Sequence, residues 1–146
     1  MRQDELKIGE LAAQTGYTVE AIRYYEHQGL LPAPARSGGN YRLYRGAHLE
    51  RLRFIRHCRS LDMALDEIRS LLTFRDHPEQ SCGAVNALLD KHIVDVAERI
   101  AQLKDLERQL LALRGCCKEE QTARDCAILQ CLGQDTSPSA TPPGLP

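Results

Sequence analysis

The 146-residue sequence contains no tryptophan and only two phenylalanines, so its core must be built mainly from aliphatic side chains, as in helical proteins. It has no apolar run of about 18 residues, the length that a membrane-spanning helix requires, so we expect no membrane span. The polar residues 1–5 are not followed by an apolar segment, so we expect no secretory signal. An acid/base pair and a phosphate-binding loop are also missing, which argues against a hydrolase or transferase. These absences predict a cytoplasmic, mainly α-helical protein that is not an enzyme.

The net charge of −1 hides an asymmetry along the chain. Residues 1–75 contain 12 Lys and Arg against 9 Asp and Glu, whereas residues 76–146 contain 7 against 11. A modest positive bias suits contact with phosphates but proves nothing alone. The first half is therefore the part of the chain to search for nucleic-acid-binding motifs.

The N-terminal segment predicts two short helices joined by a turn. A first helix starts at residues 8–12, and Gly16 breaks it. Thr18 is a favourable N-cap for a second helix, residues 19 to about 28, which Gly29 ends. This is the pattern of a helix-turn-helix, in which the second helix enters the major groove of DNA.

Turn and strand signals follow the second helix. Residues 38–40 (GGN) are typical of a turn, and residues 41–44 (YRLY) alternate like a short strand, so residues 35–44 are predicted to form a hairpin or wing. Two connecting amphipathic helices are then predicted by the helical spacing of Leu49, Leu52, Ile55, Leu65, Ile68, Leu71 and Leu72. Ala64 occupies an N-cap position without a capping side chain, a weakness of roughly 0.5–2 kcal/mol. Residues 1–75 thus read as a winged helix-turn-helix DNA-binding domain with connector helices.

Side chains on the second helix and the wing are candidates for DNA contact. Arginine binds phosphate or guanine, and tyrosine hydroxyls commonly contact the backbone. The candidates are Arg23, Tyr24, Arg36, Asn40, Tyr41, Arg42 and Tyr44. Tyr25 is expected in the core instead. As a set in this order, these residues favour double-stranded DNA as a partner.

One long helix is predicted from residue 83 to about residue 114, where no proline interrupts the chain. Its apolar residues follow a coiled-coil spacing with one slip: Leu89, Ile93, Val96, Ile100, Leu103, Leu106, Leu110 and Leu113. At about 1.5 Å per residue this helix would extend past its own domain, so an antiparallel homodimer is the natural way to bury the seam. The alternative is a helix that packs within its own chain. Residues 76–114 are therefore predicted to be a dimerisation helix.

Four segments together resemble the MerR family of transcriptional regulators. They are residues 8–12 (IGELA), 22–26 (IRYYE), 29–32 (GLLP) and 40–44 (NYRLY), and the resemblance extends to about residue 133. It implies a homodimer bound to a promoter with a longer spacer than usual, repressed in the apo form. It also implies that metal binding distorts and untwists this DNA, so that RNA polymerase aligns with both promoter elements.

Three of the six cysteines are candidate metal ligands. Cys82 precedes the long helix, and Cys117 and Cys126 follow it with eight residues between them. Thiolates are soft donors that favour Cd²⁺, Pb²⁺, Hg²⁺, Zn²⁺ and Cu⁺ over Mg²⁺ or Ca²⁺. The resemblance implies that Cys82 marks a sensor of divalent ions, because sensors of monovalent ions carry Ser there. It also implies that Cys82 of one subunit meets the loop of the other, so that one ion ties both chains together.

The residues around these cysteines rank the metals. Residues 81–88 and 126–130 resemble cadmium- and lead-responsive members, whereas the pair Cys116-Cys117 resembles zinc-responsive members. Zinc sensors, however, place a His where this chain has Gln121, and no His follows His92. Three thiolates without nitrogen suit ions larger and softer than Zn²⁺. We therefore expect Cd²⁺ or Pb²⁺ as effector, then Zn²⁺, then Hg²⁺, with Cys116 as a candidate fourth ligand.

The last part of the chain is predicted to be a metal-binding loop and short helix, residues 115–132, followed by a disordered tail, residues 133–146. Cys58 is expected in the core, Cys131 away from the metal, and His92 in a packing or surface role. Two other hypotheses stay open. In one, a disulfide of Cys116, Cys117 or Cys126 is a redox switch, and oxidant activates without metal. In the other, structural zinc only holds the dimer together, and the apo protein neither dimerises nor binds DNA.

Overall fold

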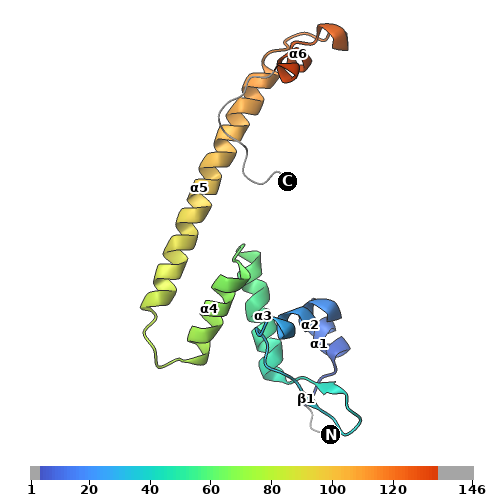
Figure 1. The fold of residues 1–146 in the computed structure, drawn as a ribbon, viewed down its shortest axis with the longest axis vertical. Helices are drawn as coiled ribbons and strands as arrows, with labels where there is room; N and C mark the ends of the chain where they lie inside the picture. The colour runs from blue at the N-terminus through green and yellow to red at the C-terminus, as the bar shows by residue number, and fades with distance from the viewer. Residues whose placement is uncertain (1–3, 135–146) are drawn as a thin grey trace. The chain divides into compact units, whose positions relative to one another are not determined.

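The computed structural model describes residues 4–134, and the described part is mainly helical with one two-stranded hairpin (Figure 1). The chain divides into two compact units, residues 1–92 and 93–146. Most of the predicted disordered tail, residues 135–146, lies outside the described residues. Within residues 4–134, no helix combines the length and the apolar character that a membrane crossing requires.

The helix-turn-helix prediction is confirmed by α1 (Ile8–Thr15) and α2 (Val19–His27). Gly16 ends α1 in the left-handed conformation, with φ of 76°, and a Cβ there would lie 2.0 Å from Nη1 of Arg56. The positive φ therefore favours glycine at this turn, because the end of the flexible Arg56 side chain can shift whereas the backbone angle is fixed by the fold. Thr18 is the N-cap of α2, where its Oγ1 accepts a hydrogen bond from the Ala21 N–H at 3.1 Å.

The hairpin prediction is also confirmed. Strand β1 (Ala35–Arg36) pairs antiparallel with β2 (Arg42–Leu43), with Ala35 opposite Leu43. The left-handed turn residue is Asn40, with φ of 65°, and neither Gly38 nor Gly39 has a positive φ. A short asparagine side chain tolerates this conformation better than most.

Two connector helices follow, α3 (Gly46–Ser60) and α4 (Leu65–Asp76). Ala64 is the N-cap of α4 and has no capping side chain, as predicted. Glu67 partly compensates, because its Oε1 accepts a hydrogen bond from the Ala64 N–H at 3.0 Å. This is the reciprocal half of a capping box.

The buried apolar residues of the described chain all lie within the first unit. Tyr25 and Cys58 are among them, as predicted. The core cluster comprises Leu11, Ile22, Tyr25, Leu30, Leu31, Tyr44, Leu52, Ile55, Cys58, Met63, Ile68, Leu71 and Leu72. It is mainly aliphatic, as the scarcity of aromatic residues implied.

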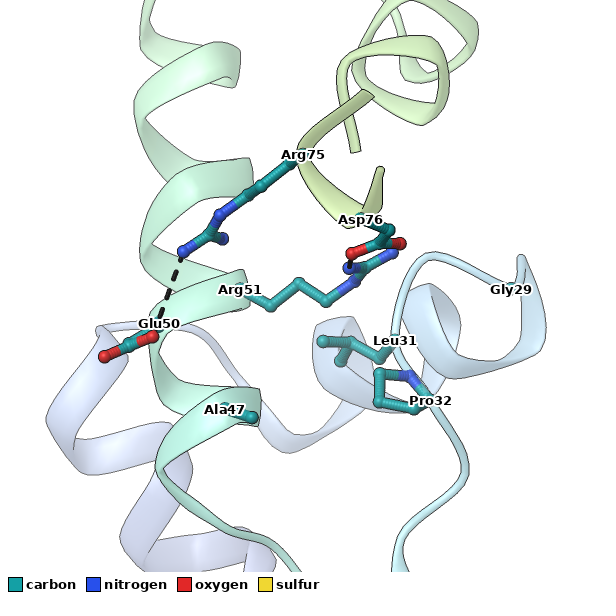
Figure 2. Close-up of a pocket in the computed structure, with 8 residues that line it drawn as sticks. All are labelled: Gly29, Leu31, Pro32, Ala47, Glu50, Arg51, Arg75 and Asp76. Carbon is teal, nitrogen blue, oxygen red and sulfur yellow. Dashed lines mark hydrogen bonds and ion pairs between the residues drawn. The ribbon is translucent and has the colours of Figure 1, made fainter. Parts of the chain in front are cut away.

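An ion-paired pocket lies where the loop after α2 meets α3 and α4 (Figure 2). Arg51 of α3 donates from Nε to the Leu30 carbonyl at 2.6 Å and from Nη1 to Oδ1 of Asp76 at 2.8 Å. The hydrogen bond from Arg51 lowers the pKa of the Asp76 carboxyl below its ordinary value. Arg51 therefore connects three elements of the first unit through directional bonds.

Helix α5 (Gly83–Arg114) has the bounds that the sequence predicts, and it contains no buried residue. Val85 and Leu88 are partly buried against the core of the first unit. The remaining described segments are a short 3₁₀ helix, η1 (Ala123–Asp125), and α6 (Ala127–Gly133). These match the predicted loop and short apolar helix after residue 115.

Candidate functional site

Helix α2 presents two candidate DNA contacts to solvent. Ile22 and Tyr25 point into the core, and the helical period then places Arg23 and Tyr24 on the outer face. Tyr24 is 48% exposed. The core residues of α2 thus orient its polar residues outward.

The hairpin holds four more of the predicted residues. Arg36 donates from Nη1 to the Asn40 carbonyl at 3.3 Å, which closes the turn on itself. Tyr41 is 65% exposed, and Nζ of Lys7 lies 5.6 Å from its ring centroid. Arg42 pairs from Nη1 with Oε2 of Glu26 at 3.3 Å, which links the hairpin to α2. The turn and this ion pair hold the hairpin beside the outer face of α2.

Two adjacent hollows run between α2 and the hairpin, and Arg23 and Arg42 line both. The predicted residues that line one or both hollows are Arg23, Tyr24, Arg36, Asn40, Tyr41 and Arg42. The cationic side chains here outnumber the carboxylates, which are Glu10 and Glu26. The surface is suited to the charge of a phosphate backbone.

Tyr44 departs from the sequence prediction of a DNA contact. Its side chain is fully buried, and its hydroxyl donates a hydrogen bond to Oε1 of Glu26. Burial, and then this hydrogen bond, raise the pKa of Tyr44 to about 12. Its backbone pairs with Leu6 through two hydrogen bonds of 2.8 Å. In this structure Tyr44 is a core residue that anchors the hairpin, and it does not reach the solvent-facing surface.

Cys117 and Cys126 come together in the second unit. Nη1 of Arg114 donates to the Cys117 carbonyl at 2.8 Å, which positions the start of the loop after α5. Cys126 is the N-cap of α6, where the backbone N–H of Leu129, followed by that of Ile128 and the Cys117 thiol, lowers the pKa of the Cys126 thiol. Both sulfur-bearing residues are half-buried. The lowered pKa favours the thiolate of Cys126, which is the form that binds metal.

A second thiol contact lies beside the first. The Cys116 thiol donates to the Ala112 carbonyl at 3.5 Å, and its interaction with the neighbouring Cys131 thiol of α6 raises the pKa of Cys116. Both residues are exposed. The chain thus folds back so that Cys116 faces Cys131 and Cys117 faces Cys126, an arrangement that the sequence spacing did not reveal.

Cys82 is exposed and immediately precedes α5. Its carbonyl accepts a hydrogen bond from the Asn86 N–H at 3.0 Å, which begins the helix. Across residues 4–134, no group of three or more His, Cys, Asp or Glu side chains is placed to hold a metal ion. As donor chemistry, the exposed Cys82 thiol and the pair Cys117 and Cys126 fit a soft metal ion.

Two features of these surfaces were not anticipated. Lys7 contributes a cation beside Tyr41, and the only sequence signal for it is its place just before α1. The backbone N–H groups of Ile128 and Leu129 lower the pKa of the Cys126 thiol. The apolar residues after Cys126 signalled a helix start, which is where such unpaired N–H groups occur.

Comparison with known proteins identifies relatives of the chain. The model "MerR HTH family regulatory protein" matches residues 6–74, and the model "MerR, DNA binding" matches residues 49–113. The HTH-type transcriptional regulator ZntR homolog of Haemophilus influenzae is 51% identical over 109 residues, which cover 75% of this chain and 81% of that protein.

Two solved structures are also similar. The transcription regulator PbrR691 from Ralstonia metallidurans CH34, in complex with lead(II), is 53% identical with a TM-score of 0.80, covering 87% of this chain and 98% of that one. The dual-function transcriptional regulator MerR from Bacillus megaterium MB1, in complex with mercury(II), is 31% identical with a TM-score of 0.69, covering 88% of this chain and all of that one. The relatives are regulators rather than enzymes, as the sequence predicted.

Proposed function

Because the chain belongs to the MerR family of transcriptional regulators, we propose that it is a cytoplasmic regulator that represses a heavy-metal resistance promoter and activates it on binding Cd²⁺ or Pb²⁺. The observation that carries the proposal is the contact between Cys117 and Cys126 in a chain that also has an exposed Cys82. Three thiolates without nitrogen match soft ions. The similarity to a regulator solved with lead(II) supports the same choice.

Promoter DNA is the proposed partner of the first unit. The hollows between α2 and the hairpin bring together Arg23, Tyr24, Arg36, Asn40, Tyr41 and Arg42. Helix α2 would enter the major groove, while the hairpin contacts the adjacent backbone. Tyr44 is not included, because its side chain is buried.

A homodimer is the proposed assembly. The seam residues of α5 from Leu89 to Leu110 are exposed in the single chain, between 39% for Leu89 and 63% for Ile93, and Leu113 is half-buried. An apolar stripe of this length is typical of a coiled-coil partner interface. In an antiparallel pair, Cys82 of one protomer would meet Cys117 and Cys126 of the other, so the ion would bridge both chains. Residues 76–114 would then be the dimerisation helix and residues 115–132 the metal loop.

The proposed transcriptional response depends on a difference in metal affinity between two conformations of the protein. Metal must bind the activating conformation more tightly than the repressing one, because equal affinity would shift no population. The bridged dimer would reposition the two DNA-reading units, distorting the promoter so that RNA polymerase engages it. Because thiolates must lose their protons to bind metal, the response should weaken as pH falls.

The test is anaerobic titration of the reduced full chain with Cd²⁺, Pb²⁺, Zn²⁺ and Hg²⁺, followed by thiolate charge-transfer absorbance. Cys82→Ser, Cys117→Ser and Cys126→Ser should each weaken binding and abolish transcription from a promoter selected by the apo protein. Cys131→Ser is the matched control, since it removes an exposed thiol outside the proposed site. Wild-type stoichiometry and response in all three site variants would contradict the proposal. Tighter binding of Zn²⁺ or Hg²⁺, or loss of binding in Cys116→Ser, would revise the metal or the ligand set.

A thiol redox switch is the second candidate, and the contact between Cys116 and Cys131 favours it. Two exposed thiols within hydrogen-bonding reach can form a disulfide, with hydrogen peroxide reduced to water as the oxidant. This hypothesis predicts transcription after peroxide treatment without metal, and loss of that response in Cys131→Ser. The metal hypothesis predicts no such activation.

A further inference from the structure

The first ten residues of α5 contact the first unit along one helical face. Val85 and Leu88 are partly buried against the core cluster, and His92 is the last residue of that unit. Their spacing of three and then four residues puts the three side chains on the same side of the helix. Beyond His92 the next apolar side chains are exposed, beginning with Ile93 at 63% and Val94 at 54%.

His92 is the polar member of this face, and its two ring nitrogens each lie close to an acceptor in the connector. Its Nε2 lies 2.9 Å from the Leu61 carbonyl, which is in the turn between α3 and α4. Its Nδ1 lies 3.2 Å from Oε2 of Glu67, in the first turn of α4. The other oxygen of Glu67 accepts from the Ala64 N–H, so one carboxylate links α5 to the start of α4. The His92 side chain is only 15% exposed, and that of Glu67 is 29% exposed, so both lie partly within the protein.

The environment of His92 differs from that of the buried His48. Nδ1 of His48 accepts from the Arg45 N–H at 3.1 Å, and its Nε2 lies 3.1 Å from the Pro32 carbonyl, so a neutral ring satisfies both partners. Both partners of His92 are acceptors. A neutral ring donates to one of them, and a protonated ring donates to both. The site is therefore built for a donor side chain.

The polar contacts of His92 restrict the rotation of α5 about its axis, which the apolar contacts of this face do not. Burial of Val85 and Leu88 favours contact but is non-directional, so by itself it permits α5 to turn about its axis. Hydrogen bonds weaken steeply away from a preferred angle, so the bonds of His92 restrict that rotation. We propose that His92 is a positioning residue that sets the rotation of α5 on the DNA-reading unit and transmits the metal signal to it.

This inference rests on the proposed function, because it assigns a path for the response to metal bound at Cys82, Cys117 and Cys126. Cys82 lies one residue before α5, and His92 lies ten residues later on the same helix. A helix transmits rotation along its length because each turn is hydrogen-bonded to the next. A change at Cys82 would then reach α4 through His92 and Glu67.

The experiment compares metal binding with transcription in the full-length dimer. In His92→Leu, Cd²⁺ stoichiometry and affinity should stay within about twofold of wild type. The ratio of transcription with and without Cd²⁺ should fall at least about fivefold, the lower end of typical coupling between sites. His92→Arg should restore most of the ratio, because guanidinium donates to both acceptors. Lys91→Leu, at an exposed neighbouring position, should leave it unchanged.

Several outcomes would overturn the inference. These are a wild-type response in His92→Leu, a parallel loss of Cd²⁺ binding in that variant, or an equal loss of response in Lys91→Leu. If thermal unfolding shows that His92→Leu does not fold, His92→Gln takes its place, since its amide can still donate to the Leu61 carbonyl. That variant should show a reduced response, and a wild-type response would overturn the inference. A wild-type protein that binds no soft metal would instead overturn the proposed function, and the inference with it.

Discussion

The first unit, which carries the DNA-binding elements, and helix α5 differ in how they bury their apolar residues. The first unit holds the core cluster, in which Leu11, Ile22, Leu52, Ile55 and Ile68 have no exposed surface. Helix α5 has 32 residues and no buried one, and its apolar seam faces solvent in the single chain. The first unit therefore carries its own stabilising core, whereas the proposed homodimer would bury the seam of α5 against another chain.

This difference separates two kinds of stability. Burial of a leucine or isoleucine contributes about 1.5–3 kcal/mol, and in the first unit that contribution does not depend on protein concentration. For the α5 seam, the proposed dimer would gain the same contribution only on association, so it would depend on concentration. Four predictions test this comparison.

The largest effect is expected from charges placed in the seam. The double variant Leu103→Asp/Leu106→Asp would bury uncompensated carboxylates in the proposed dimer interface, at about 3–5 kcal/mol for each. We expect a monomer at micromolar concentration by analytical ultracentrifugation. Gln102→Asp, which adds a carboxylate at an exposed position outside the seam, should remain dimeric. A dimeric double variant would mean that α5 is not the interface.

A truncation in the core should destabilise the reading unit itself. Leu52→Ala should lower the free energy of unfolding by about 2–5 kcal/mol, because it leaves a cavity among fully buried neighbours. Urea denaturation should give this decrease independently of protein concentration. Leu103→Ala is the matched change in the seam, and its effect should vary with protein concentration. Equal and concentration-independent effects would abolish the distinction between the two regions.

Removal of one arginine from the hollows between α2 and the hairpin should have an intermediate effect, on the free energy of DNA binding. Arg23 lines both hollows between α2 and the hairpin, so Arg23→Ala should cost about 1–3 kcal/mol of DNA-binding free energy. Fluorescence anisotropy at several salt concentrations measures the affinity and the salt slope. Arg53→Ala removes the same charge from a position on α3 outside these hollows, and it should bind more nearly like wild type. Equal losses would point to a general effect of charge.

The smallest effect is expected from acid titration of the pocket in Figure 2. Arg51 lowers the pKa of Asp76, so the ion pair adds stability above pH 3.8, the ordinary aspartate value, and loses it as pH falls through the lower folded value. Asp76 is half-exposed, so the contribution should stay below about 1 kcal/mol. Asp76→Asn should therefore reduce stability at pH 7 and reduce its fall between pH 5 and pH 2. An unchanged acid profile in the variant would show that the pair contributes nothing.

The elements that local signals define were predictable from the sequence. Gly16, Thr18 and Gly29 end or begin α1 and α2 because glycine adopts positive φ and a threonine hydroxyl caps a helix N-terminus. The bounds of α5 followed from a long run without proline. Six of the seven candidate DNA contacts gather on one surface, because the wing and α2 keep the order that the motif implied.

Residues that depend on distant partners were less predictable. Tyr44 ends an alternating segment and was expected outside, but pairing with Leu6 and a hydrogen bond to Glu26 direct it inward. Cys131 was expected not to contact the metal, and the spacing gave no sign that α6 places it beside Cys116. The bonds of His92 to Leu61 and Glu67 join positions more than 20 residues apart.

The sequence alone determined the helices, the wing, the α5 seam and the candidate thiol residues, because periodicity, capping residues and donor chemistry act locally along the chain. Only the tertiary structure decided which tyrosine is buried, which thiols face each other and which side chain holds α5 to the connector. These depend on contacts between residues far apart in the chain. The physical reason is that packing and hydrogen-bond geometry are settled only when separate elements meet.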